Sequence, residues 1–253
     1  MSIATIFCKE VRHNFKKYFG NWEPTEMIKL GDIGVIENDM FIHLGNVSTM
    51  GLTSLPIEIQ NGVGNKTFST KDSVSVKLKA KATVAGINTN AGVEIAFSMG
   101  NSLFINAIDC SVERFSDKIS LGNKILDLYK IEKKWNKNWV VITDIITSKN
   151  TTIAISETAN SNIVLEAASN AISQIDLMDA NLSLTVTTNN QVGYCVESRV
   201  NITPFFSICG IKDTWFNEAQ FHALTDKQYI PGFKSGGKFG FIQAETEEFG
   251  EIE

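Results

Sequence analysis

The sequence predicts an α+β fold with a twisted, mostly antiparallel central sheet and surrounding helices. Several stretches alternate between apolar and polar residues and are separated by turn residues, which is typical of strands joined by hairpins. Other stretches repeat their apolar residues every three to four positions, which is typical of helices. With 253 residues, of which 43% are hydrophobic and 20% charged, the chain can bury one large core.

A helix is predicted near the start of the chain, in "EVRHNFKKYF", residues 10–19. Its apolar residues have the spacing of one helical face and are Val11, Phe15, Tyr18 and Phe19. Its polar side carries Arg12, Lys16 and Lys17. The helix therefore either lies on a membrane surface or turns a solvated face to water.

Two short strands are predicted in "KLGDIGVIENDMFIHLGNV", residues 29–47, around the turn residues 37–39. Farther on, "GVGNKT", residues 62–67, has some features of a phosphate-binding loop. That loop needs a glycine directly before its lysine, and Asn65 occupies this position. Nucleotide binding is therefore not expected.

The clearest strand signal is "VSVKLKAKATVA", residues 74–85. One face of this strand is apolar and the other is mostly lysine, because the two kinds of residue alternate without a break up to Val84. A turn is expected at residues 86–92, after which the alternation resumes. The apolar face of this predicted hairpin comprises Val74, Val76, Leu78, Ala80, Ala82, Val84, Val93, Ile95 and Phe97.

A second hairpin of the same design is predicted around a turn at residues 188–191. Its apolar residues are Leu182, Leu184, Val186, Val192, Tyr194 and Val196. Between the two hairpins, residues 138–148 are rich in β-branched side chains, which predicts a buried strand. Hairpin connections between most strands favour an antiparallel sheet.

Charge is distributed unevenly along the chain. The net charge of −5 argues against nucleic acid as a partner, because phosphate binding needs a basic surface. Residues 1–20 hold four basic residues and one acidic residue, whereas residues 239–253 hold five glutamates and no basic residue. The C-terminal end thus carries as much net charge as the whole chain.

Neither a catalytic site nor a metal site is predicted. The three histidines, His13, His43 and His222, are scattered, and the four cysteines form no CxxC pair. Cys209 and His222 have the chemistry of a nucleophile and its base, but nothing in the sequence brings them together. We expect a protein that is not an enzyme and that has no metal ion or other cofactor.

A cytoplasmic protein is expected. The apolar run at the start of the chain is too short for a signal peptide. No unbroken stretch of about 18 apolar residues could span a bilayer as a helix. The scattered cysteines suit a reducing compartment.

The two amphipathic hairpins have two interpretations. In a soluble protein they form a half-buried sheet whose lysines face water and discourage pairing at the edge. In a membrane, where strands of about 9 to 11 residues span the bilayer, the apolar face contacts lipid and the polar face contacts water. The alternation by itself favours the soluble sheet.

Three longer segments are similar to the bacterial gasdermins. They are "LGDIGVIENDMFIHLGNV" (residues 30–47), "AFSMGNSLFINAIDCSVERFSD" (96–117) and "KKWNKNWVVITDIITSKNTTIAIS" (133–156). The resemblance lies in the order and character of these segments and extends to about residue 200. It includes no catalytic signature.

The resemblance implies a pore-forming protein that is monomeric and autoinhibited until a protease removes a short C-terminal inhibitory segment. In the family, the freed body binds membrane lipid and assembles on the inner membrane into an oligomeric β-barrel pore, which kills the cell as a defence against phage. The implied division is a pore-forming domain at 1–228, a cleavable linker at 229–238 and an autoinhibitory peptide at 239–253. The two hairpins, at about 73–97 and 181–197, would become membrane-spanning strands, although the second could begin further upstream.

The end of the chain has the composition that such a division requires. The linker is rich in glycine and contains a proline, as exposed cleavable loops do. It consists of Tyr229, Ile230, Pro231, Gly232, Phe233, Lys234, Ser235, Gly236, Gly237 and Lys238. The peptide places four apolar anchors among its glutamates, namely Phe239, Phe241, Ile242 and Phe249. A cut after Lys238 removes five negative charges, which brings the net charge of the body from −5 to about 0 and reduces its repulsion from anionic lipid.

Many bacterial gasdermins carry a lipid on a cysteine near the N-terminus, and Cys8, after the apolar "IATIF", is the matching residue. The resemblance thus implies a covalent palmitoyl group on Cys8, although Cys8 lies deeper in the chain than the first few residues. A buried thiol is the alternative. For the whole chain, the alternative function is a non-enzymatic lipid or small-ligand binding protein whose hairpins stay folded and whose tail belongs permanently to the sheet.

Overall fold

The computed structural model describes residues 2–24, 27–70, 72–80, 82–84, 87–167, 176–177, 184–198, 201–214 and 217–224. Within these residues β-sheet dominates, and every strand pair is antiparallel, which confirms the predicted sheet type. The prediction that helices surround the sheet is not confirmed. This part of the chain contains two α-helices, α1 (Ile3–Phe15) and α2 (Lys118–Lys130), and the short 3-10 helix η1 (Val47–Met50).

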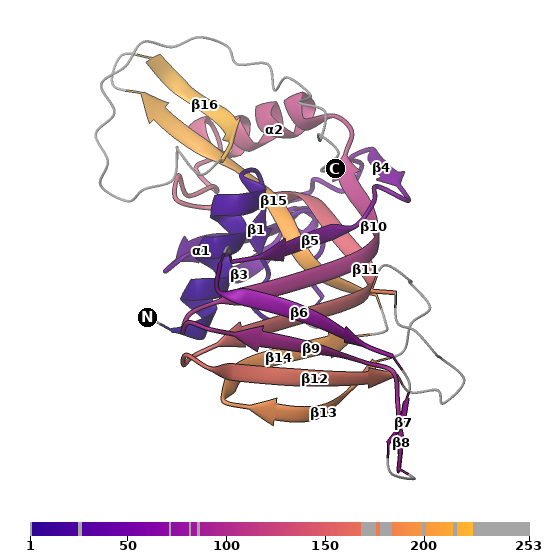
Figure 1. Cartoon of the computed structure of the whole chain (residues 1–253). Helices are drawn as coiled ribbons and strands as arrows, with labels where there is room; N and C mark the ends of the chain where they lie inside the picture. The colour runs from indigo at the N-terminus through magenta and orange to yellow at the C-terminus, as the bar shows by residue number, and fades with distance from the viewer. Residues whose placement is uncertain are drawn as a thin grey trace.

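A large sheet of ten strands forms the body of the molecule (Figure 1). Its strands are β1 (Phe19–Gly20), β2 (Asp32–Glu37), β3 (Met40–Asn46), β4 (Ile57–Gln60), β5 (Lys66–Ser69), β10 (Leu103–Phe115), β11 (Val140–Ser156), β14 (Val192–Ser198), β15 (Ile202–Thr214) and β16 (Asn217–Ala223). At its centre, β11 pairs on one side with β15 and then β14, and on the other side with β2 and then β10. The predicted buried strand at 138–148 is confirmed, and it continues to Ser156 because β-branched residues continue there.

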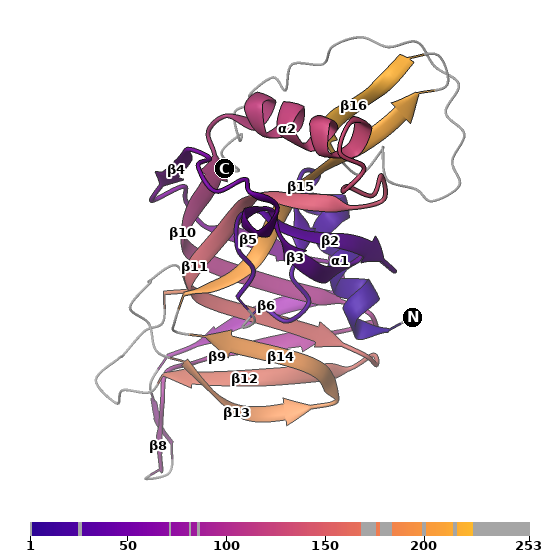
Figure 2. The same ribbon diagram turned by 180° about the vertical axis from the view of Figure 1, so that it is seen from behind.

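A second sheet has four strands, in the order β13-β12-β9-β6. These are β6 (Val74–Lys79), β9 (Gly92–Phe97), β12 (Ser161–Ala167) and β13 (Leu184–Asn190). A two-stranded ribbon, β7 (Ala82–Val84) and β8 (Ile87–Thr89), projects beyond one end of this sheet in both views (Figures 1 and 2). The chain thus makes one large sheet and a smaller one beside it.

Helix α1 and the four-stranded sheet cover opposite faces of β10 and β11. Side chains alternate along β10, so Leu103 and Ile105 point to one face and Phe104 points to the other. Leu103 and Ile105 pack against α1, whereas Phe104 packs against β9 and β12. The centre of the large sheet is therefore buried on both faces.

Helix α2 packs its apolar side, Leu121, Ile125 and Leu128, against the upper part of the large sheet. Close packing against β16 requires the small residue Gly122. A Cβ atom at this position would lie 2.7 Å from ring carbon Cδ1 of Phe221. This helix thus covers a part of the sheet remote from the four-stranded sheet (Figure 2).

The first helix begins and ends earlier than the sequence predicts, at Ile3–Phe15 in place of 10–19. The hydroxyl oxygen of Ser2 accepts a hydrogen bond from the Thr5 N–H (3.2 Å) and caps the helix. Phe19 lies beyond the helix in β1, opposite Phe206. Phe19 has the apolar spacing of the predicted helix because its side chain is buried like those of the helix, although the residue belongs to a strand.

The hairpin predicted at 29–47 is confirmed as β2 and β3. The hairpin predicted at 74–97 is also confirmed, but residues 87–89 of the predicted turn 86–92 form the strand β8. Strand β6 pairs with β9, and β7 pairs with β8. The whole segment is therefore one long, interrupted hairpin.

The second predicted hairpin is wrong. Strand β13 pairs with β12 in the four-stranded sheet, whereas β14 pairs with β11 in the large sheet. The chain leaves one sheet and enters the other at Gln191, whose φ is 56°. Apolar alternation identifies both strands, but it does not specify the strand with which each one pairs.

Candidate functional site

The four-stranded sheet is the candidate functional site, because it holds most of the residues predicted to contact lipid. Its central strands bury their apolar side chains against the large sheet. These side chains are Val93, Ile95 and Phe97 on β9, and Ile163, Leu165 and Ala167 on β12. The β12 residues are not predicted from the sequence, because the apolar Val164 interrupts the alternation of Ile163, Leu165 and Ala167 with polar residues.

The apolar face of this sheet emerges into solvent at both edges. On β6, Val76 is 39% exposed and Leu78 is 54% exposed, and on β13, Val186 is 39% exposed. Ala80 is also exposed, whereas Val74 is half-buried and Leu184 is buried. The edge strands therefore bury only part of their apolar face, whereas β9 and β12 bury the apolar side chains that point to the large sheet.

The opposite face of the sheet is polar and carries balanced charges. Lys77 is exposed opposite Glu94, and Lys79 Nζ lies 3.2 Å from Glu94 Oε2. Glu166 on β12 accepts a hydrogen bond from Asn90 (3.4 Å). The solvent-facing lysines predicted for the first strand are thus confirmed for these two positions, and the sheet has one apolar and one polar face.

All four connections between the two sheets lie at the same end of the four-stranded sheet. The chain crosses between β5 and β6 at 70–73, between β9 and β10 at 98–102, between β11 and β12 at 157–160, and between β13 and β14 at Gln191. The strand register places the four crossings together, since Val74 pairs with Phe97, Phe97 with Ser161, and Asn162 with Asn190. The sheet is therefore covalently joined to the body along one end.

The predicted lipid-facing residues of β14 belong to the body. Val192 packs beneath the four-stranded sheet, whereas Tyr194 and Val196 pack on the other face, near α1. The Tyr194 hydroxyl donates to the Trp22 carbonyl oxygen (3.3 Å), and burial raises the pKa of Tyr194 to about 12. These contacts hold β14 in the large sheet.

Cys8, the predicted lipid attachment site, is a core residue in this structure. Its side chain is packed between α1 and the large sheet, and its Sγ lies 3.5 Å from the Gly20 carbonyl oxygen. Burial raises its pKa from 9.0 to about 12, so the reactive thiolate is scarce at neutral pH. Attachment of a lipid would require α1 to move away from the sheet.

Arg12 does not join the exposed basic face of α1, as the sequence predicts, but is buried. Its Nη1 lies 3.0 Å from Asp39 Oδ1, and its guanidinium stands 4.9 Å from the ring centre of Phe19. Lys16 and Lys17 are exposed. The ion pair between Arg12 and Asp39 joins α1 to the turn between β2 and β3. It could not be predicted from the sequence, because the two residues are 27 positions apart.

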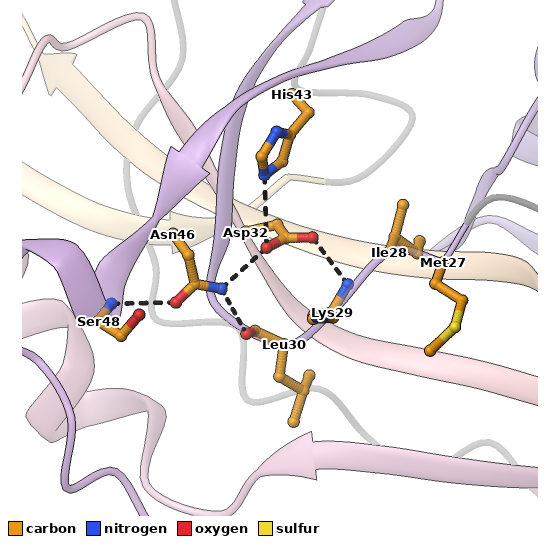
Figure 3. Close-up of a pocket in the computed structure, with 8 residues that line it drawn as sticks. All are labelled: Met27, Ile28, Lys29, Leu30, Asp32, His43, Asn46 and Ser48. Atoms are coloured by element: carbon orange, nitrogen blue, oxygen red, sulfur yellow. Dashed lines mark hydrogen bonds and ion pairs between the residues drawn. The ribbon is translucent and has the colours of Figure 1, made fainter.

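A cavity of about 610 Å³ lies beside β2 and β3 (Figure 3). Its lining residues are Met27, Ile28, Lys29, Leu30, Asp32, His43, Asn46 and Ser48.

Asp32 is the centre of the polar part of this cavity. It accepts hydrogen bonds from the Lys29 N–H and from Asn46 Nδ2, both at 2.8 Å, and lies 3.6 Å from His43 Nε2. Asn46 in turn accepts a bond from the Ser48 N–H (3.0 Å) and caps η1. These hydrogen bonds hold the local backbone in place. This structural role explains why the polar side chains lie together, so a bound ligand is not needed to explain them.

The structure does not bring Cys209 and His222 together. His222 pairs with Gly210, so its side chain lies on the face of the sheet opposite to that of Cys209. Cys209 Sγ lies 3.6 Å from Thr143 Oγ1, and burial raises its pKa to about 11. The arrangement offers no nucleophile and base pair at these residues.

Several predicted features lie outside the described residues. These are the linker at 229–238, the peptide at 239–253 with its four anchors, and Leu182. Within the described part of the chain, no cluster of three or more His, Cys, Asp or Glu side chains could hold a metal ion. Neither described helix has the length and apolarity needed to cross a membrane.

Comparison with known proteins gives a distant likeness. No protein-family model matches the chain, and no curated protein matches it. Among solved structures, a bacterial gasdermin from Bradyrhizobium tropiciagri aligns with a TM-score of 0.39 and 10% sequence identity, over 87% of this chain and 90% of that chain. This likeness is too distant to assign the chain to a family.

Proposed function

We propose that this protein is a non-enzymatic pore former that inserts the strands of its four-stranded sheet into a membrane. The observation that carries the proposal is the form of this sheet. It has one apolar and one polar face, its apolar face is already exposed at both edges, and it is joined to the body at one end. These are the properties needed by strands that leave a soluble fold and enter lipid.

The energetics favour lipid as the destination of the buried face. Val93, Ile95 and Phe97 are fully buried, and exposing each of them to water costs roughly 1.5–3 kcal/mol. Lipid removes this penalty because it replaces the lost apolar contacts. The sheet should therefore stay closed in water and open at a membrane.

Strand pairing supports an oligomer in the membrane. Within the described residues, β6 and β13 each pair with one neighbour and so form the two edges of the sheet. A bilayer leaves unpaired backbone groups without hydrogen bonds, which costs several kcal/mol for each group. We therefore propose that copies of the chain pair edge to edge into a closed β-barrel, whereas the soluble protein is a monomer.

The length of the first segment also supports insertion. Strand β6 is 6 residues long, which is too short to span a bilayer, since about 9 to 11 residues are required. The alternating pattern continues through β7 to residue 84, giving a sufficient length if the two strands join.

Activation by proteolysis is the part of the proposal that rests on sequence. The linker at 229–238 would be cut, and release of 239–253 would remove five glutamates and their repulsion from anionic lipid. We propose a cytoplasmic precursor that acts at the inner membrane, in the antiphage role that the bacterial gasdermin resemblance implies. Palmitoylation of Cys8 would require α1 to move first, because the thiol is buried in the closed fold.

Dye release from liposomes tests the proposal. A specific protease site placed within 229–238 allows the chain to be cut at will, with the uncut protein as the control. We expect release only after the cut. A confirmed cut with dissociation of the peptide but no release would contradict pore formation and favour the lipid or ligand carrier.

A further inference from the structure

Three buried serines occupy the end at which the two sheets are joined. We call Ser73, Ser102 and Ser156 the serine cluster. Ser73 and Ser102 lie in two of the crossings, and Ser156 is the last residue of β11, directly before a third. Their exposed fractions are 3%, 1% and 0%, in the order Ser73, Ser102 and Ser156. Because buried hydroxyl groups need hydrogen-bond partners, their bonds determine how firmly this junction is held.

The hydrogen bonds of the cluster run from one crossing to the next. Ser102 Oγ donates to Ser73 Oγ (2.8 Å), and Ser73 Oγ donates to the Thr70 carbonyl oxygen (3.2 Å). In a second chain of bonds, the Ser102 N–H donates to Ser156 Oγ (3.0 Å), which donates to the Met99 carbonyl oxygen (3.0 Å). Ser102 Oγ also lies 3.0 Å from the Met99 carbonyl oxygen, and Ser156 Oγ lies 3.4 Å from the Ser102 carbonyl oxygen. Each of the three buried hydroxyl groups therefore has at least one acceptor within the junction.

Backbone bonds reinforce the same junction. The Ser98 N–H donates to the Ser73 carbonyl oxygen (2.8 Å), and the Asn101 N–H donates to the Ser156 carbonyl oxygen (2.9 Å). At the fourth crossing, Thr158 Oγ1 donates to Gln191 Oε1 (3.2 Å). All four crossings are thus linked by hydrogen bonds.

A buried hydrogen-bond network of this kind resists small displacements and fails abruptly. In a dry site, moving one crossing leaves several polar groups unpaired at once, which is unfavourable. Once the junction opens far enough for water to enter, water replaces the lost bonds at little net cost. The junction should therefore behave as a latch with a closed and an open state.

We propose that the serine cluster is the latch that holds the four-stranded sheet closed on the large sheet, and that its opening releases the strands. The role of the serine cluster in releasing the strands rests on the proposed function. The closing role itself concerns the uncut protein in water and can be tested without a membrane.

Hydrogen exchange of the intact, full-length protein tests the closing role. Ser102→Ala and Ser156→Ala each remove one hydroxyl from the network. We expect the amides of β9 and β12 to exchange about tenfold faster in both variants, since one lost buried bond shifts local opening by about this factor. The amides in the part of β11 paired with β15 should keep their protection.

Ser148→Ala is the matched control. Ser148 is equally buried on β11, and its hydroxyl lies 2.8 Å from the Ile108 carbonyl oxygen and 3.0 Å from that of Asn150, within the large sheet. This variant should leave exchange in β9 and β12 unchanged. Equal exchange of β9 and β12 in the control and in the cluster variants would overturn the proposal.

A reversible crosslink tests the latch in the opposite direction. The double variant Ser73→Cys with Ser102→Cys places two thiols where hydroxyl oxygens stand 2.8 Å apart. After the cut in the linker, the oxidised protein should release no dye from liposomes, and reduction should restore release. Equal release in both redox states would overturn the proposal. A failure of the wild-type chain to release dye would instead count against pore formation, and hydrogen exchange would then decide whether the latch exists.

Discussion

At the scale of single residues, Leu78 is the position at which folding and insertion can be separated. It is more than half exposed in the soluble fold, so a polar side chain is tolerated there. In the proposed pore the same side chain faces lipid, where a lysine near the bilayer centre costs about 2–4 kcal/mol per chain. Its neighbour Lys77 faces the opposite side of the strand and would contact water in both states.

Leu78→Lys should therefore abolish dye release and leave the free energy of unfolding within about 0.5 kcal/mol of the wild-type value. Ile59→Lys is the matched control, because Ile59 is an equally apolar, 63% exposed strand residue of the body, on β4. Thermal unfolding and dye release by the cut proteins provide the two readouts. Full release by Leu78→Lys, or equal loss in both variants, would contradict the assigned lipid face.

The buried thiols predict a stability that declines at alkaline pH. Burial raises the pKa of Cys8 from 9.0 to about 12, so its folded-state pKa lies above that of the unfolded chain. Between these values the unfolded state has lost the proton and the folded state has kept it. The stabilisation is complete below about pH 9 and is lost as pH rises, by about 1.4 kcal/mol per pH unit for each such thiol.

Urea unfolding of the wild type and of Cys8→Ala at about pH 8 and about pH 10 measures this effect. We expect Cys8→Ala to be less stable at the lower pH because of its cavity, but to lose less stability on going to the higher pH. An identical pH dependence in the two proteins would mean that Cys8 is not protonated and buried as described. The same burial predicts slow alkylation of Cys8 by iodoacetamide.

At the scale of elements, the second membrane segment should be the β12–β13 pair in place of the predicted 181–197 hairpin. Strand β13 belongs to the four-stranded sheet, whereas β14 is held in the body by Tyr194 and by its pairing with β11. Val186 and Val196, which the sequence places on one predicted hairpin, should therefore have different environments in the pore.

An environment-sensitive dye attached at Val186→Cys or Val196→Cys measures this difference. After the cut and addition of liposomes, the dye at position 186 should shift its emission to shorter wavelength, and the dye at 196 should not. Cys195, which is half-buried, is replaced by serine in both variants to avoid labelling there. A shift at 196 without one at 186 would restore the hairpin that the sequence predicts.

This difference shows where sequence reasoning succeeds and where it fails. Alternation predicts which residues share a face of β6, β9 and β13, because it follows from local geometry alone. On β14 it is wrong for Val192, because a register shift places this residue on the face opposite to that of Tyr194 and Val196. It cannot identify β12 as the partner of β13, since pairing depends on the packing of distant strands. The serine cluster and the Arg12–Asp39 pair are missed for the same reason, because their members are far apart in the chain.

At the scale of the whole molecule, the proposed pore formation requires a stationary body and a sheet that moves away from it. Helix α1, β10, β11 and β15 form the body, in which the central strand is buried on both faces. The four-stranded sheet shares one apolar layer with this body and is joined to it along one end. Separation of these two parts is the central claim.

A distance measurement between the two parts tests this claim most directly. Spin labels at Leu78→Cys on β6 and Ile59→Cys on β4 report the separation of sheet and body by pulsed electron paramagnetic resonance. The intact protein should give one narrow distance distribution, and the cut protein in liposomes should give a clearly longer one. Dye release with an unchanged distance distribution would contradict the account, because the sheet would then have stayed on the body while the membrane leaked.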